Sequence, residues 1–141
     1  MSKRILVIND TQEILELFRI LLEGEGYEVV LSGEPLQKVK EVEQVHPDLI
    51  LLDLIFRQEK TGWQMLQMLR MDRLTASIPI VICTAALQDV QEQEGYLNSL
   101  GIRIVYKPFD VDVLFAVVKT ALETASPETA SPPNAAQKEP R

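Results

Sequence analysis

The stretch Leu49-Ile50-Leu51-Leu52-Asp53 is an uninterrupted apolar run that ends in a carboxylate. Short apolar runs that alternate with helical patterns are typical of buried parallel strands. In an open α/β sheet, ligands bind outside the carboxyl ends of the strands, so we expect the polar residues at such run ends to converge on one pocket. Three further apolar runs also end in polar residues: 5–8 before Asn9 and Asp10, 80–83 before Thr84, and 102–106 before Lys107.

Apolar periodicity predicts five strands and five helices in alternation. Asp10 or Thr11 is the expected N-cap of the first helix, and Gly24 and Gly26 are expected to end it. Alternation with short connections predicts an α/β fold, a doubly wound five-stranded parallel sheet flanked by five helices. The strands are expected at 4–8, 27–31, 48–52, 80–83 and 102–106, and the helices at 11–23, 35–44, 62–70, 87–100 and 111–123.

The 141 residues suffice for one domain with its own hydrophobic core, which we expect at 1–123. Residues 124–141 are rich in proline and small residues and contain no aromatic residue, so they are predicted to be a disordered tail. Too few residues remain in that tail to bury the core of a further DNA-binding or catalytic domain.

The chain carries 14 lysines and arginines against 21 aspartates and glutamates, for a formal net charge of -7. This acidic balance argues against direct nucleic-acid binding. No apolar run approaches a membrane span, and the N-terminus lacks a signal-peptide pattern, so we expect a cytoplasmic protein without a membrane partner. Cys83, inside a predicted central strand, is expected to be a buried structural thiol, and Trp63 a half-buried aromatic at the start of its helix.

Four short segments together resemble the receiver domain of two-component response regulators, over residues 3–123. The resemblance implies the flavodoxin-like receiver fold and a stand-alone response regulator. Such a protein accepts a phosphoryl group from a histidine kinase or phosphotransfer protein and signals to a downstream protein whose identity the sequence does not give. It is expected to be a monomer or weak homodimer. It is not expected to be a turnover enzyme. The segments are Ile-Leu-Val-Ile-Asn-Asp at 5–10, Pro-Asp-Leu-Ile-Leu-Leu-Asp-Leu at 47–54, Ile-Pro-Ile-Val-Ile-Cys-Thr-Ala at 78–85 and Tyr-Lys-Pro-Phe-Asp at 106–110.

The resemblance also implies a Mg²⁺ site. Asp10 is the carboxylate that binds the metal directly, Asp53 shares it, and the backbone carbonyl of Ile55 is the third protein contact. Asn9 stands where the family usually has an acid, and it is expected to reach the metal only weakly, through water. The loss of one charge predicts weaker metal binding, because Mg²⁺ is a hard cation that prefers anionic oxygen ligands.

For the phosphoryl group, the resemblance makes Asp53 the phosphoacceptor, Thr84 the hydroxyl that bonds the group and Lys107 the ammonium that pairs with it. General chemistry supports these roles. A carboxylate that attacks phosphorus forms an acyl phosphate, and the attack brings two anions together. A divalent cation and an ammonium offset that repulsion. The Thr84 hydroxyl gains its contact only when the group arrives, and a contact made in one state alone shifts a conformational equilibrium.

One departure from the family pattern affects the switch. Ile104 stands three residues before Lys107, where the family often has an aromatic that turns inward on activation. Tyr106 points to the same face as Ile104 by strand alternation, so a muted or altered switch is expected. By analogy with the family, the face that meets the downstream partner is formed by the predicted elements at 87–100, 102–106 and 111–123.

Two apolar positions bear on the lifetime of the phosphorylated state. They are the second residue after the acceptor, Ile55, and the second residue after the threonine, Ala86. In the family these positions tune dephosphorylation. Neither side chain here can orient an attacking water, so a long-lived phosphorylated state is predicted.

Three alternative functions remain beside this interpretation. Asn9 and Ile104 favour a phosphorylation-independent pseudo-receiver that acts as an interaction module. An aspartate-nucleophile phosphohydrolase would need a second carboxylate two residues after Asp53, where Ile55 stands. A flavodoxin-like cofactor binder would need a glycine-rich phosphate loop after the first strand, where Asp10 would instead repel a phosphate.

Overall fold

The structure of the chain, a computed structural model, describes residues 2–33, 39–53, 61–85, 87–107 and 110–124. The predicted alternation is confirmed, and each described element end differs from its prediction by no more than a single residue. Residues 35–38, where the second helix was expected to begin, lie outside the described part. The elements are β1 (Arg4–Ile8), α1 (Gln12–Gly24), β2 (Glu28–Ser32), α2 (Val39–Val45), β3 (Leu49–Leu52), α3 (Thr61–Met71), β4 (Ile80–Thr84), α4 (Leu87–Ser99), β5 (Arg103–Tyr106) and α5 (Val111–Thr124).

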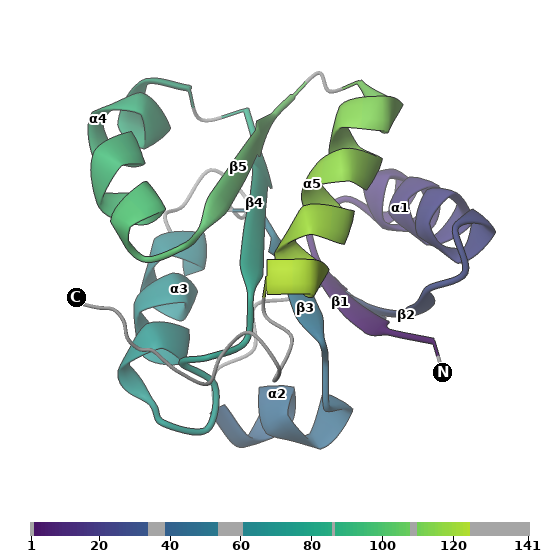
Figure 1. The fold of residues 1–141 in the computed structure, drawn as a ribbon, viewed down its shortest axis with the longest axis horizontal. Coiled ribbons are helices and arrows are strands. Elements are labelled where there is room, and N and C mark those ends of the chain that lie inside the picture. Colours follow the sequence, from purple (N-terminus) through teal and green to yellow (C-terminus); the bar gives the residue numbers. More distant parts are fainter. Residues whose placement is uncertain (1, 34–38, 54–60, 86, 108–109, 125–141) are drawn as a thin grey trace.

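The strands form one parallel sheet in the order β2-β1-β3-β4-β5 (Figure 1). Ile8 pairs with Leu52, Leu52 with Ile82, and Thr84 with Tyr106, so the strand ends lie level at the carboxyl edge. The predicted doubly wound five-stranded parallel sheet is confirmed. Because the order of strands reverses between β1 and β3, a ligand crevice is expected outside the ends of these two strands.

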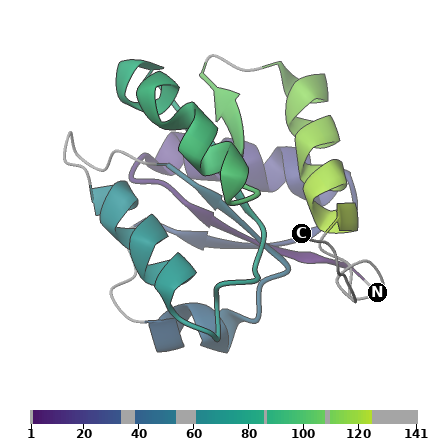
Figure 2. The ribbon, with the colours of Figure 1, turned by 60° about the vertical axis from the view of Figure 1, so that its left-hand side comes forward.

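Helices cover both faces of the sheet: α1 and α5 lie on one face, and α2, α3 and α4 on the other (Figure 2). Successive strand residues alternate between the faces, so Val7 and Leu51 face the first group while Ile8 and Leu52 face the second. Every residue of β3 and β4 is buried, which explains their continuous apolar runs. None of the described helices is both long and apolar enough to cross a bilayer.

Glycines set the turns that lead from α1 into β2 and from α4 into β5. Gly26 has φ +92° and donates its N–H to the Glu23 carbonyl at 3.0 Å, and Gly101 has φ +77° and donates to the Asn98 carbonyl at 3.0 Å. Both conformations are left-handed, where a side chain would be strained. The expectation that Gly26 ends the first helix is confirmed, and each turn aims the following strand back into the sheet.

Cys83 is buried in β4 with 2% of its surface exposed, as expected for a structural thiol. The pKa of this thiol is raised to about 12, mainly by burial, while Lys107 opposes the rise and Asp53 adds to it. The unfolded chain ionises at a lower pH than the folded one. The contribution of Cys83 to stability is therefore complete below about pH 9 and is lost as the pH rises toward 12.

Native Cys83 is expected to resist alkylation. A thiol with a pKa near 12 carries roughly a thousandfold less thiolate at neutral pH than one near 9. Iodoacetamide at pH 8 should therefore leave the folded protein unmodified and label it once in urea, as measured by intact mass. Equal labelling rates in the folded and unfolded protein would contradict the buried placement.

Candidate phosphoacceptor site

The described residues that were predicted to form the site lie at the carboxyl edge of the sheet. Backbone pairing continues for one residue beyond the strands. The Asp53 N–H donates to the Ile8 carbonyl at 3.1 Å, and the Lys107 N–H donates to the Thr84 carbonyl at 3.1 Å. These bonds fix the position at which each functional side chain leaves the backbone, so residues far apart in the sequence meet at one edge.

Asp53 lies at the centre of this site, with 8% of its surface exposed. Its Oδ2 accepts hydrogen bonds from the Lys107 ammonium at 3.2 Å and from the Asn9 amide at 3.3 Å. The Lys107–Asp53 ion pair is largely shielded, with the two side chains 22% and 11% exposed. Partial burial strengthens such a charge-assisted contact relative to one in water. Three of the predicted site residues are thus in direct contact.

Asn9 has a second role that the sequence analysis missed. Only 2% of its surface is exposed, and its Oδ1 accepts the Thr11 N–H at 2.9 Å. A backbone N–H can only donate, so the amide oxygen must face Thr11 and the amide nitrogen must face Asp53. An Asn two residues before the N-cap region of a helix is the available sequence signal for such a turn. Asn9 therefore acts as a neutral donor to the Asp53 carboxylate.

Asp10 follows Asn9 and is half-buried at the start of the turn into α1. Thr11 occupies the N-cap position of that helix, but its side chain makes no capping hydrogen bond. The Thr11 hydroxyl instead donates to Asp10 Oδ1 at 3.3 Å. The prediction that Asp10 or Thr11 is the N-cap is confirmed for Thr11, although its side chain makes no capping hydrogen bond.

The remaining predicted residues divide into described and undescribed ones. Thr84 is fully buried at the end of β4, next to β5, whose following residue is Lys107. Its neighbour across the ladder is Tyr106. Ile55 and Ala86 lie outside the described residues. The structure therefore places Thr84 at the same edge as Asp53 and leaves the roles of the other two as predictions.

The oxygen donors at this edge fit a magnesium ion. Within the described ranges no group of three or more His, Cys, Asp or Glu side chains is arranged around a common centre. Mg²⁺ does not require such a cage, because it is usually bound by one or two carboxylates together with waters and substrate phosphates. Asp10 and Asp53 supply two carboxylates. Asn9 supplies a neutral amide at the position where an acid would add a third negative charge.

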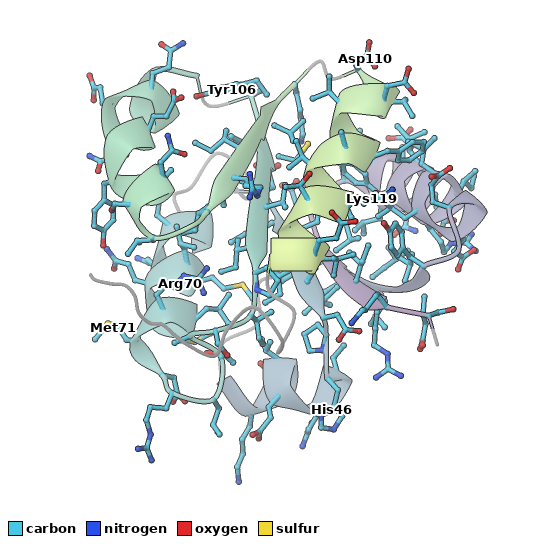
Figure 3. The ribbon with its side chains drawn as sticks, viewed as in Figure 1. His46, Arg70, Met71, Tyr106, Asp110 and Lys119 are labelled. Atoms are coloured by element: carbon cyan, nitrogen blue, oxygen red, sulfur yellow. The ribbon has the colours of Figure 1, made fainter. Side chains whose placement is uncertain are left out.

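Tyr106 connects the site to α4. Its hydroxyl donates to Glu94 Oε1 at 3.1 Å, and its side chain lies between β5 and α4 (Figure 3). Burial, followed by this hydrogen bond, raises the pKa of Tyr106. Ile104 and Tyr106 pack against the same core, so the prediction that they share a face is confirmed. Tyr106, the residue immediately before Lys107, is thus hydrogen-bonded to α4.

Known proteins share this sequence pattern. The chain is 33% identical to the DNA-binding response regulator MtrA of Mycobacterium tuberculosis over 130 residues, which are 92% of this chain and 55% of that protein. It is 36% identical to the DNA-binding dual master transcriptional regulator RpaA of Synechocystis over 119 residues, which are 84% of this chain and 48% of the relative. The chain spans about half the length of these curated relatives.

Solved structures share the fold. The signal receiver domain of a putative Luxo repressor protein from Vibrio parahaemolyticus superposes with a TM-score of 0.78 at 21% identity, covering 92% of this chain and 97% of that one. A two-component response regulator from Clostridium difficile has a TM-score of 0.72 at 27% identity, covering 86% and 97%. The family model described as the response regulator receiver domain matches residues 5–119. With the sheet order and the polar edge described above, this match shows that the chain belongs to the receiver-domain family of response regulators.

Proposed function

We propose that this chain is a stand-alone response regulator that accepts a phosphoryl group on Asp53 and signals through protein–protein contacts. A receiver domain is a phosphoacceptor module rather than a turnover enzyme, and it implies a histidine kinase as partner. We infer that a histidine kinase or a phosphotransfer protein is the donor, in the cytoplasm. The observation that supports the proposal most is the Asp53 carboxylate held between the Lys107 ammonium and the Asn9 amide.

In the proposed reaction, a carboxylate oxygen of Asp53 attacks the phosphorus atom of a phosphohistidine on the donor. A P–O bond forms to Asp53, the P–N bond of the donor breaks, and the imidazole leaves with the electron pair of that bond. The Lys107 ammonium, 3.2 Å from Oδ2, offsets the charge of the two anions as they meet. Asn9 holds the carboxylate in place, and Thr84 offers a hydroxyl to a phosphoryl oxygen.

Asp10, Asp53 and the backbone carbonyl of Ile55 would hold Mg²⁺ in this site, with Asn9 reaching it through water. When bound, the ion neutralises charge between the carboxylate and the phosphoryl oxygens. Asn9 lowers the negative charge of the site by one relative to an acid at the same position, so the metal is bound more weakly. The Asn9 amide partly replaces the metal by giving Asp53 a permanent hydrogen-bond donor.

The signal is proposed to leave through α4, β5 and α5. Tyr106 supports this route because its hydrogen bond to Glu94 attaches the strand that precedes Lys107 to α4. A movement of Lys107 toward a phosphoryl group would therefore alter the Tyr106–Glu94 hydrogen bond. Ile104 packs against the core and has no polar group that could bind Glu94. We therefore assign the altered conformational switch to Tyr106.

A phosphorylation-independent interaction module is the second candidate. The observation that favours it is the neutral Asn9 amide, which already satisfies Asp53 in the absence of a phosphoryl group. The two candidates differ in one property: a working receiver forms an acyl phosphate, whereas the interaction module does not.

Reductive trapping tests the proposed acceptor directly. The protein is incubated with Mg²⁺ and acetyl phosphate, and borohydride then reduces an aspartyl phosphate to homoserine. Peptide mass spectrometry should find homoserine at position 53. Homoserine at another aspartate, such as Asp10 or Asp48, would overturn the assignment, and its absence from the whole chain would favour the interaction module.

The phosphorylated state is expected to be long-lived, because the apolar Ile55 cannot orient an attacking water. The Ile55→Asn variant supplies an amide that can hold such a water and should decay faster. The half-life of each phosphorylated protein is measured by intact mass after removal of acetyl phosphate. Decay of the wild type within seconds, or equal half-lives in both proteins, would contradict the expectation.

A further inference from the structure

A pocket of about 380 Å³ lies between α3 and α4, on the face of the sheet that these helices share with α2. Among the described α4 side chains from 91 to 99, Leu97 alone is buried, and the side of α4 that faces α3 lines the pocket. The volume falls within the range of about 300–1,000 Å³ that is usual for small-molecule sites. No residue of the phosphoacceptor site lines this pocket.

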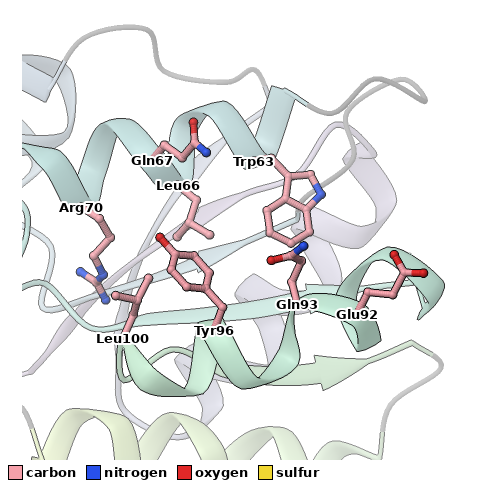
Figure 4. A pocket seen from close by; sticks show the side chains of 8 residues that line it. All are labelled: Trp63, Leu66, Gln67, Arg70, Glu92, Gln93, Tyr96 and Leu100. Carbon is pink, nitrogen blue, oxygen red and sulfur yellow. The ribbon is translucent and has the colours of Figure 1, made fainter.

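Two aromatic rings line the pocket, one from each helix. Figure 4 shows Trp63 on α3 and Tyr96 on α4 projecting into the space between the helices. Leu66 and Leu100 add apolar surface, Leu66 being buried and Leu100 partly exposed. Tyr96 is 59% exposed, which leaves much of its ring in contact with water. Aromatic side chains in a pocket favour a flat aromatic ligand, because aromatic rings stack favourably on one another.

Arg70 supplies a fixed positive charge at one end of the pocket (Figure 4). Its Nη1 donates to the Ala76 carbonyl at 2.6 Å and to the Ile78 carbonyl at 3.0 Å, which immobilises the guanidinium. Its Nε is buried and has no hydrogen-bond partner within the part of the chain that the structure describes. Burial lowers the pKa of Arg70, although an arginine remains charged at neutral pH.

The Arg70 charge therefore has neutral carbonyl partners, and no carboxylate forms an ion pair with it among the described residues. Arg70 is half-buried and its Nε has no partner among the described residues, so an incoming oxyanion would supply the missing acceptor and the missing opposite charge. The planar guanidinium matches a carboxylate in shape and donor spacing. The end of the pocket at Arg70 is accordingly suited to an acidic group.

We propose that the α3–α4 pocket binds a small flat aromatic carboxylate, with its ring against Tyr96 and Trp63 and its acid group at Arg70. The receiver would then respond to a small molecule through a site separate from Asp53. Binding would clamp α4 against α3, and α4 also holds Tyr106 through Glu94. The proposal does not depend on phosphorylation, and its test needs no phosphodonor.

The test uses 2-naphthoate as the probe and Trp63 as the reporter. Trp63 is the one tryptophan of the chain, so its indole N–H gives a single resonance in a ¹H–¹⁵N spectrum. Titration of the wild-type protein should move this resonance saturably, with a Kd of about 1 mM or tighter by calorimetry. A shift that stays linear with concentration, or no shift, would overturn the proposal.

Two matched variants locate the binding. Gln93→Phe places a ring inside the pocket and should weaken binding at least about tenfold. Gln91→Phe places the same ring on an exposed position of the same helix outside the lining and should leave the Kd unchanged. Equal affinities of the two variants would show that the probe binds elsewhere and would overturn the assignment.

The neutral analogue 2-naphthamide tests the role of Arg70 without altering the fold. It has the same ring system but lacks the negative charge, so it should bind at least about tenfold more weakly than 2-naphthoate. The Trp63 resonance and calorimetry report on both probes. Equal affinity for the acid and the amide would overturn the carboxylate assignment.

Discussion

Replacing Lys107 with alanine is expected to slow formation of the acyl phosphate from acetyl phosphate by at least about tenfold, which corresponds to about 1.4 kcal/mol of lost transition-state stabilisation. The ammonium lies 3.2 Å from Asp53 Oδ2, and both side chains are largely shielded from water. Its loss removes the positive charge that contacts Asp53 among the described residues. The initial rate of phosphorylation by intact mass measures the effect.

The same substitution should lower the free energy of unfolding by about 1.5–3 kcal/mol, the range for a hydrogen bond to a charged group. Urea unfolding followed by Trp63 fluorescence measures this loss. Lys119→Ala is the matched control, because Lys119 is an exposed lysine on α5 and its removal changes the net charge equally (Figure 3). Equal phosphorylation rates in the two variants would contradict the role assigned to Lys107.

Replacing Asn9 with aspartate is expected to change metal affinity and stability in opposite directions. The amide nitrogen that donates to Asp53 Oδ2 at 3.3 Å becomes an anionic oxygen, so a hydrogen bond is exchanged for a repulsion between carboxylates. In the presence of a chelator the variant should be less stable than the wild type by about 1–3 kcal/mol. Its affinity for Mg²⁺ should rise at least about tenfold, because a third charge joins Asp10 and Asp53.

Calorimetric titration with Mg²⁺ and urea unfolding with and without the metal measure both effects of Asn9→Asp. Asn98→Asp adds the same charge at an exposed position of α4 and serves as the control. Added Mg²⁺ is expected to restore the stability of Asn9→Asp and to leave that of Asn98→Asp unchanged. Identical Mg²⁺ affinities in the two variants would show that Asn9 does not limit metal binding.

The sequence predicts the sheet well because each strand contains a short run of Val, Ile and Leu, which is uninterrupted in the central strand β3. Both β3 and β4 are buried along their whole length, so their periodicity cannot be mistaken for that of a half-exposed helix. Strand ends then follow from the first polar residue, such as Asp53 after Leu52. The start of the helix at 35–44 had no comparable signal, because most of that segment is polar.

The sequence did not predict those contacts of the site that depend on the register between neighbouring strands. The Asn9–Asp53 hydrogen bond requires Ile8 to lie beside Leu52, a pairing that no local pattern specifies. The sequence left Asp10 and Thr11 as alternative N-caps of α1, and the structure identifies Thr11. Trp63 is half-buried as expected. The pocket that it lines is formed together with Tyr96 on α4, and the sequence does not predict how α3 and α4 lie relative to each other.

Intact mass tests the central claim, that Asp53 is the phosphoacceptor, most directly. Wild-type protein, Asp53→Asn and the exposed-site control Asp112→Asn are incubated with Mg²⁺ and acetyl phosphate and compared. We expect a single phosphoryl adduct on the wild type and on Asp112→Asn, and none on Asp53→Asn. An adduct that persists on Asp53→Asn, or no adduct on the wild type at high metal concentration, would contradict it.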